Sequence, residues 1–246
     1  MNILEVEAVT KSFGGLRAID DLSLTVRSGQ CFGIIGANGA GKTTLLNLIT
    51  GYASPNTGSI RFDGHVVTGL PPYELCRRGM GRSFQIVQPF AEMTVIDNVM
   101  TGALYSRNGR GRSLAQARTV CEQALELVGL TEQANDLAGS LTIGRQKKLE
   151  LARVLATEPK LMLLDEVMGG LTRGEIEDCI ATLERIKDTG ATIVMIEHHV
   201  HVITRLCDHV FVLDFGRALF EGTPADVIAH PEVIQAYLGK PQETQS

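Results

Sequence analysis

Gly36 to Thr43 read GANGAGKT, and this stretch decides the fold. It matches the pattern Gly-x-x-x-x-Gly-Lys-Ser/Thr at every fixed position. Glycines allow backbone N–H groups to turn inward around phosphate oxygens, and the N-terminus of a following helix faces the same anion. Lys42 can reach β- and γ-phosphates, and the Thr43 hydroxyl can coordinate Mg²⁺. The stretch therefore predicts a nucleotide-binding loop.

The residues on either side of this stretch distinguish a phosphate loop from a glycine-rich turn that happens to contain Gly-Lys-Thr. CFGIIG, residues 31–36, is a short apolar run typical of a buried strand. GKTTLLNLITG, residues 41–51, carries the apolar stripe Leu45, Leu46 and Ile49 of a helix that Gly51 closes. Strand, loop and helix follow in the order that a phosphate loop requires.

Composition limits the function classes. The chain has 246 residues, 44% hydrophobic, with a formal net charge of −5. Binding to a phosphate backbone needs a basic surface, so no nucleic-acid partner is expected. The five cysteines are odd in number, scattered and without a Cys-x-x-Cys pair, which favours reduced thiols in a cytosolic protein.

Neither a membrane span nor a signal peptide is expected from the sequence. No apolar run approaches the ~18 residues that a membrane helix requires. The start, MNILEVEAVTKSF, lacks the basic segment and long apolar stretch of a signal peptide. We therefore expect an intracellular protein that reaches a membrane only through a partner.

Hydrophobic periodicity divides the chain into an α/β core and a helical insertion. ILEVEAV and LSLTV near the N-terminus alternate like half-buried strands, and GSIRFDG reads as a further strand and turn. From Pro71 to about Leu155 the pattern is mostly helical, with helices predicted over Thr94 to Leu104 and Leu114 to Val128.

Strand–helix alternation returns after the helical stretch. KLMLLDE, ATIVMIE and HVFVLDFG read as buried strands, and EIEDCIATLERIKDTG as an amphipathic helix. In the final helical region Thr223 is the expected N-cap, with Pro224 at the first helical position and Asp226 completing the cap. The tail KPQETQS is polar and is expected to be disordered.

Two adjacent carboxylates, Asp165 and Glu166, follow the apolar strand LMLL. An acidic turn after a core strand is common, but a phosphate loop needs a carboxylate to hold its metal. Asp165 is the expected acid on the metal side, directly or through water. Glu166 can polarise an attacking water as a general base.

Three histidines lie in EHHVH: His198, His199 and His201. A metal site is one reading, but side chains of adjacent strand residues diverge and no cysteine or carboxylate cluster completes the ligand set. The preferred interpretation is that one histidine, following the strand ATIVMI, faces the γ-phosphate.

The stretch LTIGRQKKLELARVL, residues 141–155, begins as a polar loop and continues as a helix. It places a threonine, a glycine and three cations near the start of that helix. The cations can simply be solvated, or an anion can dock there, and this stretch alone does not choose between the two.

Together these motifs resemble those of ATP-binding cassette ATPases. The phosphate loop, SFQ with Gln85, LTIGR, LMLLDE and IEHH occur in the order of that family. The resemblance implies one cassette domain over about residues 1–240, with a RecA-like core over about 1–85 and 157–240, a helical subdomain over about 86–156, and a polar tail at 241–246. It also implies an N-terminal antiparallel β region beside the P-loop NTPase core.

The resemblance assigns roles to residues of this chain. Glu166, His198, Gln85 and Lys42 would be catalytic, and Thr43, Gln85 and Asp165 would hold Mg²⁺. The residues assigned to ATP are Phe13, Gly36, Ala37, Asn38, Gly39, Ala40, Gly41, Lys42, Thr43, Thr44, Thr142, Gly144 and Arg145. Phe13 would stack on adenine, although a core phenylalanine is the alternative, and Thr142, Gly144 and Arg145 would face the ATP of a second cassette.

Several residues depart from the family pattern. The signature is usually Leu-Ser-Gly-Gly-Gln, so Thr142 keeps the hydroxyl and Gly144 the close backbone approach, whereas Ile143 and Arg145 differ. Val167 replaces the usual proline, and Thr172 replaces the usual aspartate of the inter-subunit loop that includes Leu171. These changes affect contacts between subunits rather than hydrolysis within one.

Within the family, four stretches look like cassettes of branched-chain amino acid importers: SFGGLRAIDDLSL, PPYELCRRGMGRSFQIVQPFAEMTVIDNV, IEHHVHVI and EGTPADVIAHPEVIQAYLG. This implies a homo- or heterodimer of cassettes at the cytoplasmic face of the membrane, bound to two permease subunits and indirectly to an extracytoplasmic solute-binding protein. In that family IVQPFAEMTV lines a groove for the permease; a plain loop packing on its own domain is the alternative.

Three other functions remain open at this point. A lipopolysaccharide-export cassette has a similar ending and insertion. A soluble cassette ATPase of DNA repair or translation usually carries long coiled-coil insertions or duplicated cassettes, which this chain lacks. A small-molecule phosphotransferase would leave LTIGR and His198 unexplained. None of the motifs contacts the transported solute, so the solute stays undetermined.

Overall fold

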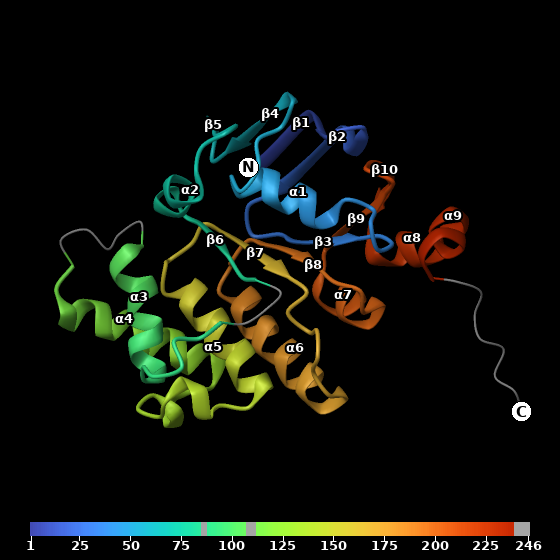
Figure 1. The fold of residues 1–246 in the computed structure, drawn as a ribbon. Coiled ribbons are helices and arrows are strands. Elements are labelled where there is room, and N and C mark those ends of the chain that lie inside the picture. Colours follow the sequence, from blue (N-terminus) through green and yellow to red (C-terminus); the bar gives the residue numbers. More distant parts are fainter. Residues whose placement is uncertain (85–87, 107–111, 239–246) are drawn as a thin grey trace, which may run out of the picture. The chain divides into compact units, whose positions relative to one another are not determined.

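The computed structural model describes residues 1–84, 88–106 and 112–238. The chain divides into two compact units (Figure 1). Unit 1 comprises Met1–Gly69 and Val194–Ser246, and unit 2 comprises Leu70–Ile193. Within the described residues, no helix is long and apolar enough to cross a bilayer.

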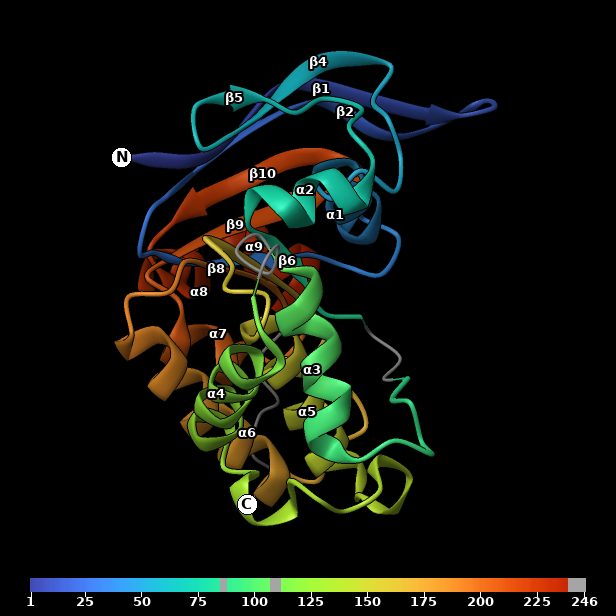
Figure 2. The same ribbon diagram turned by 90° about the vertical axis from the view of Figure 1, so that its left-hand side faces the viewer.

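Unit 1 contains an antiparallel sheet of order β2-β1-β4-β5, whose strands are labelled together in Figure 2. Its strands are β1 (Asn2–Phe13), β2 (Leu16–Arg27), β4 (Thr57–Phe62) and β5 (His65–Val66). The first two are longer than the alternation predicted, because Ala8 and Asp21 adopt positive φ angles at register shifts and let the hairpin continue past them.

The second set of strands in unit 1 has the order β10-β9-β3-β8. Its bounds are β3 (Cys31–Ile35), β8 (Ile193–Ile196), β9 (His209–Asp214) and β10 (Arg217–Gly222). β3 and β9 are parallel and wholly buried at their centres, as their apolar runs predicted. The division between the units falls at the first residue of β8.

The helices of unit 1 are α1 (Lys42–Ile49), α7 (Val200–Leu206), α8 (Pro224–Ala229), α9 (Pro231–Val233) and the π-helical turn η3 (Ile234–Leu238). α8 has the predicted start, since the Thr223 side chain accepts the Asp226 N–H and Pro224 occupies the first turn. The strand β10 was missed, because the mixed sequence RALFEG shows no clear alternation.

Unit 2 is mainly helical. Within the described residues its helices are α2 (Pro72–Arg78), α3 (Val95–Tyr105), α4 (Leu114–Val128), α5 (Ile143–Leu155) and α6 (Arg173–Asp188), with short turns η1 (Thr131–Gln133) and η2 (Ala138–Ser140). Figure 2 shows α3, α4, α5 and α6 close together. α3, α4 and α5 pack against one another, and α6 packs on α4 and α5. Thr94 and Ser113 cap α3 and α4, so both helices begin where the pattern predicted.

Two parallel strands complete unit 2: β6 (Met80–Arg82) and the fully buried β7 (Leu161–Asp165). β6 was missed in the sequence, because three residues between helix-like segments carry too little periodicity. It matters nonetheless, because it places Arg82 and the residues after it beside the end of β7.

Candidate nucleotide site

The predicted phosphate loop lies between β3 and α1 in unit 1. The chain leaves the buried strand at Gly36 and enters the helix after Gly41, and both glycines have positive φ angles. A Cβ atom at Gly36 would collide with the Leu213 carbonyl oxygen, and one at Gly41 would lie 2.6 Å from the Ala18 carbonyl oxygen. Only glycine fits both positions, so the loop geometry depends on them.

Lys42 lies across this loop. Its residue is 6% exposed, and its Nζ donates to the carbonyl oxygens of Gly36 at 2.8 Å and Ala37 at 3.0 Å. The ammonium is therefore held at the backbone of the loop, where it can bind an anion that enters the loop. Its contacts with carbonyl oxygens keep a nearly buried cation solvated by polar groups.

The rest of the loop combines buried anchors with exposed residues. The Ala40 carbonyl accepts the Gly216 N–H at 2.8 Å, and the Ala40 N–H donates to Ala37 at 3.1 Å. The remaining predicted binding residues are less buried: Ala37 and Thr44 are half-buried, and Asn38, Gly39 and Thr43 are exposed.

Phe13 ends β1 and is 53% exposed, so it is not a core phenylalanine. Its register partner on β2 is Leu16, and Ala18, two residues further, lies against Gly41. A strand advances about 3.3 Å per residue, so the hairpin end that carries Phe13 lies close to the phosphate loop.

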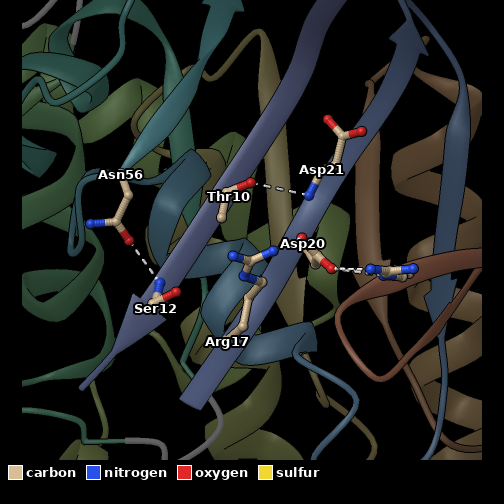
Figure 3. Close-up of polar contacts among 7 residues, drawn as sticks. Thr10, Ser12, Arg17, Asp20, Asp21 and Asn56 are labelled. Carbon is tan, nitrogen blue, oxygen red and sulfur yellow. Dashed lines mark hydrogen bonds and ion pairs between the residues drawn. The ribbon is translucent and has the colours of Figure 1, made fainter. Parts of the chain in front are cut away.

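Polar contacts fix this hairpin end. The Ser12 N–H donates to Asn56 Oδ1 at 2.7 Å, and the Asp21 N–H donates to Thr10 Oγ1 at 3.1 Å (Figure 3). Lys11 donates to the Ser54 carbonyl, and its Nζ lies 5.1 Å from the centroid of the Phe13 ring. One face of the aromatic ring is thus occupied by a cation, a contact that sequence reasoning missed.

Two of the three histidines, His198 and His199, follow β8 in unit 1 and differ in exposure. His198 is half-buried, whereas His199 is exposed and is the N-cap residue of α7. The preferred histidine is therefore the one whose side chain is partly enclosed.

Asp165 and Glu166 lie at the carboxyl end of β7 in unit 2. Asp165 is 4% exposed, and its N–H donates to Ser83 Oγ at 3.1 Å. Its Oδ2 forms an ion pair with Arg82 Nη2 at 3.1 Å. The carboxylate is thus held by the segment that follows β6. Nothing in the sequence distinguished Arg82 from the exposed Arg77 and Arg78.

Glu166 is half-buried and has a φ angle of 48°. This left-handed conformation is uncommon for a residue other than glycine, asparagine or aspartate. Strained backbone of this kind is often found where a side chain must be aimed for function. The backbone at Glu166 therefore departs from the extended conformation of β7 directly before it.

The segment after Ser83 is held by a buried carboxylate on α5. The Phe84 N–H donates to Glu150 Oε1 at 2.5 Å, and burial raises the pKa of the Glu150 carboxyl. Gln85, Ile86 and Val87 lie outside the described residues.

Further along the chain, the buried side chain of Asn98 holds the backbone of Phe90. Asn98 Oδ1 accepts the Phe90 N–H and Asn98 Nδ2 donates to the Phe90 carbonyl oxygen, while the Phe90 ring is 47% exposed.

The stretch LTIGR forms the beginning of α5. Thr142 is the N-cap, and its Oγ1 accepts the Arg145 N–H at 3.5 Å; the Arg145 side chain is exposed. A Cβ atom at Gly144 would lie 2.8 Å from Glu175 Oε1 on α6, so a larger residue would have to displace that carboxylate. Bonds from Thr172 and Gly144 lower the pKa of Glu175.

Fewer exposed cations lie at the start of α5 than the sequence predicted. Lys147 and Lys148 are buried, and Lys148 Nζ forms an ion pair with Asp178 of α6 at 2.5 Å. Arg145 is therefore the exposed cation of the stretch. Thr172, which replaces an aspartate, is the N-cap of α6 and forms a capping box with Glu175, a role that aspartate and threonine share.

Comparison with known proteins agrees with these features. Residues 19–169 match the family described as ABC transporter, and residues 219–242 match the one described as branched-chain amino acid ATP-binding cassette transporter. The chain belongs to the ABC transporter family. It is an ATP-binding cassette, and the predicted resemblance and enzyme class, an ATPase, are confirmed.

Two curated relatives are similar over nearly their full length. A high-affinity branched-chain amino acid transport ATP-binding protein of Pseudomonas aeruginosa, BraF, is 38% identical, with 97% of this chain and 98% of BraF covered. LivG of Escherichia coli, a protein with the same descriptive name, is 36% identical over the same shares of both chains.

Solved structures confirm the predicted fold class. A nucleotide-free ATP-binding cassette from an ABC transporter is 31% identical, with a TM-score of 0.86 over 98% of this chain and 100% of that one. The ADP conformation of an ATP-binding cassette is 32% identical, with a TM-score of 0.87 over the same shares. The chain is therefore a nucleotide-binding cassette with an α/β core, an antiparallel N-terminal sheet and a set of helices.

Proposed function

We propose that this cassette hydrolyses ATP to power a membrane importer of branched-chain or related amino acids. The observation that carries the proposal is the match of residues 219–242 to the branched-chain amino acid cassette family. Identities of 36–38% to BraF and LivG over 97% of the chain support the same substrate class. An exporter of lipopolysaccharide type is the second candidate, and the C-terminal match favours the importer.

The nucleotide would be bound as Mg²⁺-ATP. The aromatic ring of Phe13 would stack on the base, and the loop from Gly36 to Gly41, with Lys42 and Thr44, would hold the phosphates. The donor set fits the metal, because Mg²⁺ prefers hard oxygen ligands such as the Thr43 hydroxyl and the Asp165 carboxylate. Bound Mg²⁺ would neutralise charge on the phosphates.

The residues of the chain would divide the work of hydrolysis. Glu166 would accept a proton from the attacking water, and His198 would orient that water or the γ-phosphate. Lys42 would stabilise charge on the phosphate oxygens. Gln85 would complete the set as a metal- and water-facing residue.

A second cassette, identical or homologous, would complete the site. Thr142, Gly144 and the start of α5 would face the phosphates of the nucleotide on the partner cassette, since a helix N-terminus favours anions. Arg145 is exposed, whereas Lys147 and Lys148, which follow it, are buried. We place it toward the same nucleotide, where it would make a charge-assisted contact.

The transporter would include two permease subunits and, indirectly, an extracytoplasmic solute-binding protein, with the cassettes peripheral on the cytoplasmic face. We retain the division into a core of about residues 1–85 and 157–240, a helical subdomain of about 86–156 and a tail of 241–246. Phe90 belongs to the surface that would receive the permease. Its ring is 47% exposed, and the Arg153 guanidinium lies 5.1 Å from its centroid.

Uptake by whole cells tests the proposed function. Deleting the gene should abolish high-affinity uptake of radiolabelled leucine, isoleucine or valine, and a plasmid copy should restore it. Normal leucine uptake in the deletion strain would refute the importer.

A substitution at Phe90 tests the proposed contact with the permease. Phe90→Asp should leave ATP hydrolysis by the isolated cassette within about two-fold yet fail to restore uptake, because a charge replaces an apolar contact. Phe215→Asp, at an exposed turn of unit 1, is the matched control and should restore uptake.

The two histidines give a second test. His198→Ala should lower ATP turnover by about 10²-fold or more, because a group positioned at the reacting phosphate is lost. His199→Ala should be mild, since this side chain is exposed at the start of α7. Phosphate release by the purified variants measures both, and the reverse ranking would transfer the role to His199.

A further inference from the structure

The ion pair between Arg82 and Asp165 is nearly buried. Their side chains are 10% and 6% exposed, and Arg82 Nη2 lies 3.1 Å from Asp165 Oδ2. The two residues lie at the carboxyl ends of the neighbouring parallel strands β6 and β7. In open α/β sheets ligands bind outside these strand ends, so the pair is placed where a ligand would arrive.

Other contacts hold both partners in place. Ser83 Oγ accepts the Asp165 N–H, which fixes the end of β7 next to the end of β6. The Arg82 guanidinium also lies 5.2 Å from the centroid of the Phe84 ring, and the Phe84 N–H is bound by the buried Glu150. The guanidinium therefore keeps a cation–π contact even when the carboxylate accepts another cation.

The position of this pair is hard to explain by stability alone. Taking two opposite charges out of water offsets most of their attraction, so a buried pair is weak evidence for stabilisation. Removing only one partner, however, leaves a buried charge without compensation. Asp165 thus has a cation supplied by its own chain in a state without metal.

We propose that Arg82 is the resident counter-cation of Asp165 and sets the Mg²⁺ concentration that nucleotide binding requires. This rests on the proposed role of Asp165 as the metal-side acid. An ionised carboxylate has about four lone-pair sites, so Asp165 can accept a metal or its water in addition to its contact with Arg82. The positive guanidinium repels Mg²⁺ at short range and weakens its binding to Asp165. It also neutralises the Asp165 carboxylate until Mg²⁺ arrives with the nucleotide.

A Mg²⁺ titration of nucleotide binding tests the proposal. A fluorescent, non-hydrolysable ATP analogue is titrated into the full chain at a series of Mg²⁺ concentrations, which gives the concentration for half-maximal tightening. Arg82→Met should lower that midpoint on the order of ten-fold, because one nearby positive charge is removed. Arg82→Lys, which keeps the charge, and Arg78→Met, which removes an exposed arginine of the same unit, should leave it within about two-fold. An unchanged or higher midpoint in Arg82→Met overturns the proposal.

Asp165→Asn separates this proposal from the proposed function. That variant lacks a charged metal ligand, so its Mg²⁺ midpoint should rise whether or not Arg82 is present. If Asp165→Asn keeps the wild-type midpoint, the metal role of Asp165 is wrong; if its midpoint rises but Arg82→Met matches the wild type, only the role of Arg82 is wrong.

A measurement on the unmodified chain covers the case in which Arg82→Met does not fold. The Arg82 Nε–H signal, assigned by its loss in Arg82→Lys, is followed by NMR with the analogue bound. It should shift on adding Mg²⁺ with the midpoint seen in the binding titration. If adding Mg²⁺ does not shift the Arg82 Nε–H signal, the proposal is overturned.

Discussion

Replacing Glu166 by glutamine is expected to lower ATP turnover by roughly 10²–10⁴-fold, the usual range for loss of a positioned general base. Nucleotide binding should persist, because glutamine has nearly the same shape and lacks only the basic oxygen. The φ angle of 48° at this residue should also persist, since the substitution does not alter the backbone preference. With hydrolysis blocked, the ATP-bound dimer should accumulate.

Phosphate release and size-exclusion chromatography with Mg²⁺-ATP measure the two effects together. Glu126→Gln, an exposed glutamate on α4 of the same unit, is the matched control and should hydrolyse ATP at the wild-type rate. Wild-type turnover in Glu166→Gln would exclude this carboxylate as the base. Loss of turnover without a dimer would leave the base in place and contradict the proposed two-cassette site.

Features with local causes were predictable from the sequence. The phosphate loop requires glycine at positions 36 and 41, so these residue types are enough to predict its geometry. The start of α8 could be read from Thr223, Pro224 and Asp226, because a capping box involves only neighbouring residues. Long apolar periodicities likewise predicted α3 and α4.

Features that depend on distant residues were not predictable. β6 has only three residues, and its pairing with β7 depends on a strand about eighty positions away in the sequence. The same distance separates Arg82 from Asp165. The Lys148–Asp178 pair likewise joins two helices and changed the expected charge at the start of α5. Sequence patterns along one element contain no information on such partners.

Replacing Lys42 by alanine is expected to weaken nucleotide binding by roughly 10²–10⁴-fold, as loss of two charge-assisted hydrogen bonds would. In the structure the ammonium already spans the loop through the carbonyl oxygens of Gly36 and Ala37. Arriving phosphates offer stronger, negatively charged acceptors at the same place, so the lysine needs little rearrangement to bind them. The variant loses both the charge and the bridge that shapes the loop.

Three variants separate these two contributions. Lys42→Met keeps much of the side-chain length without the charge, and Lys42→Arg keeps the charge in a wider, planar group. If charge dominates, Lys42→Met should bind as poorly as Lys42→Ala and Lys42→Arg should retain part of the affinity. Arg61→Met, on the exposed face of β4 in the same unit, is the control for lost charge. Titration with a fluorescent ATP analogue gives the affinities, and thermal melting checks that each variant is folded. Near-wild-type affinity in folded Lys42→Ala would mean that backbone N–H groups and the start of α1 bind the phosphates without the lysine.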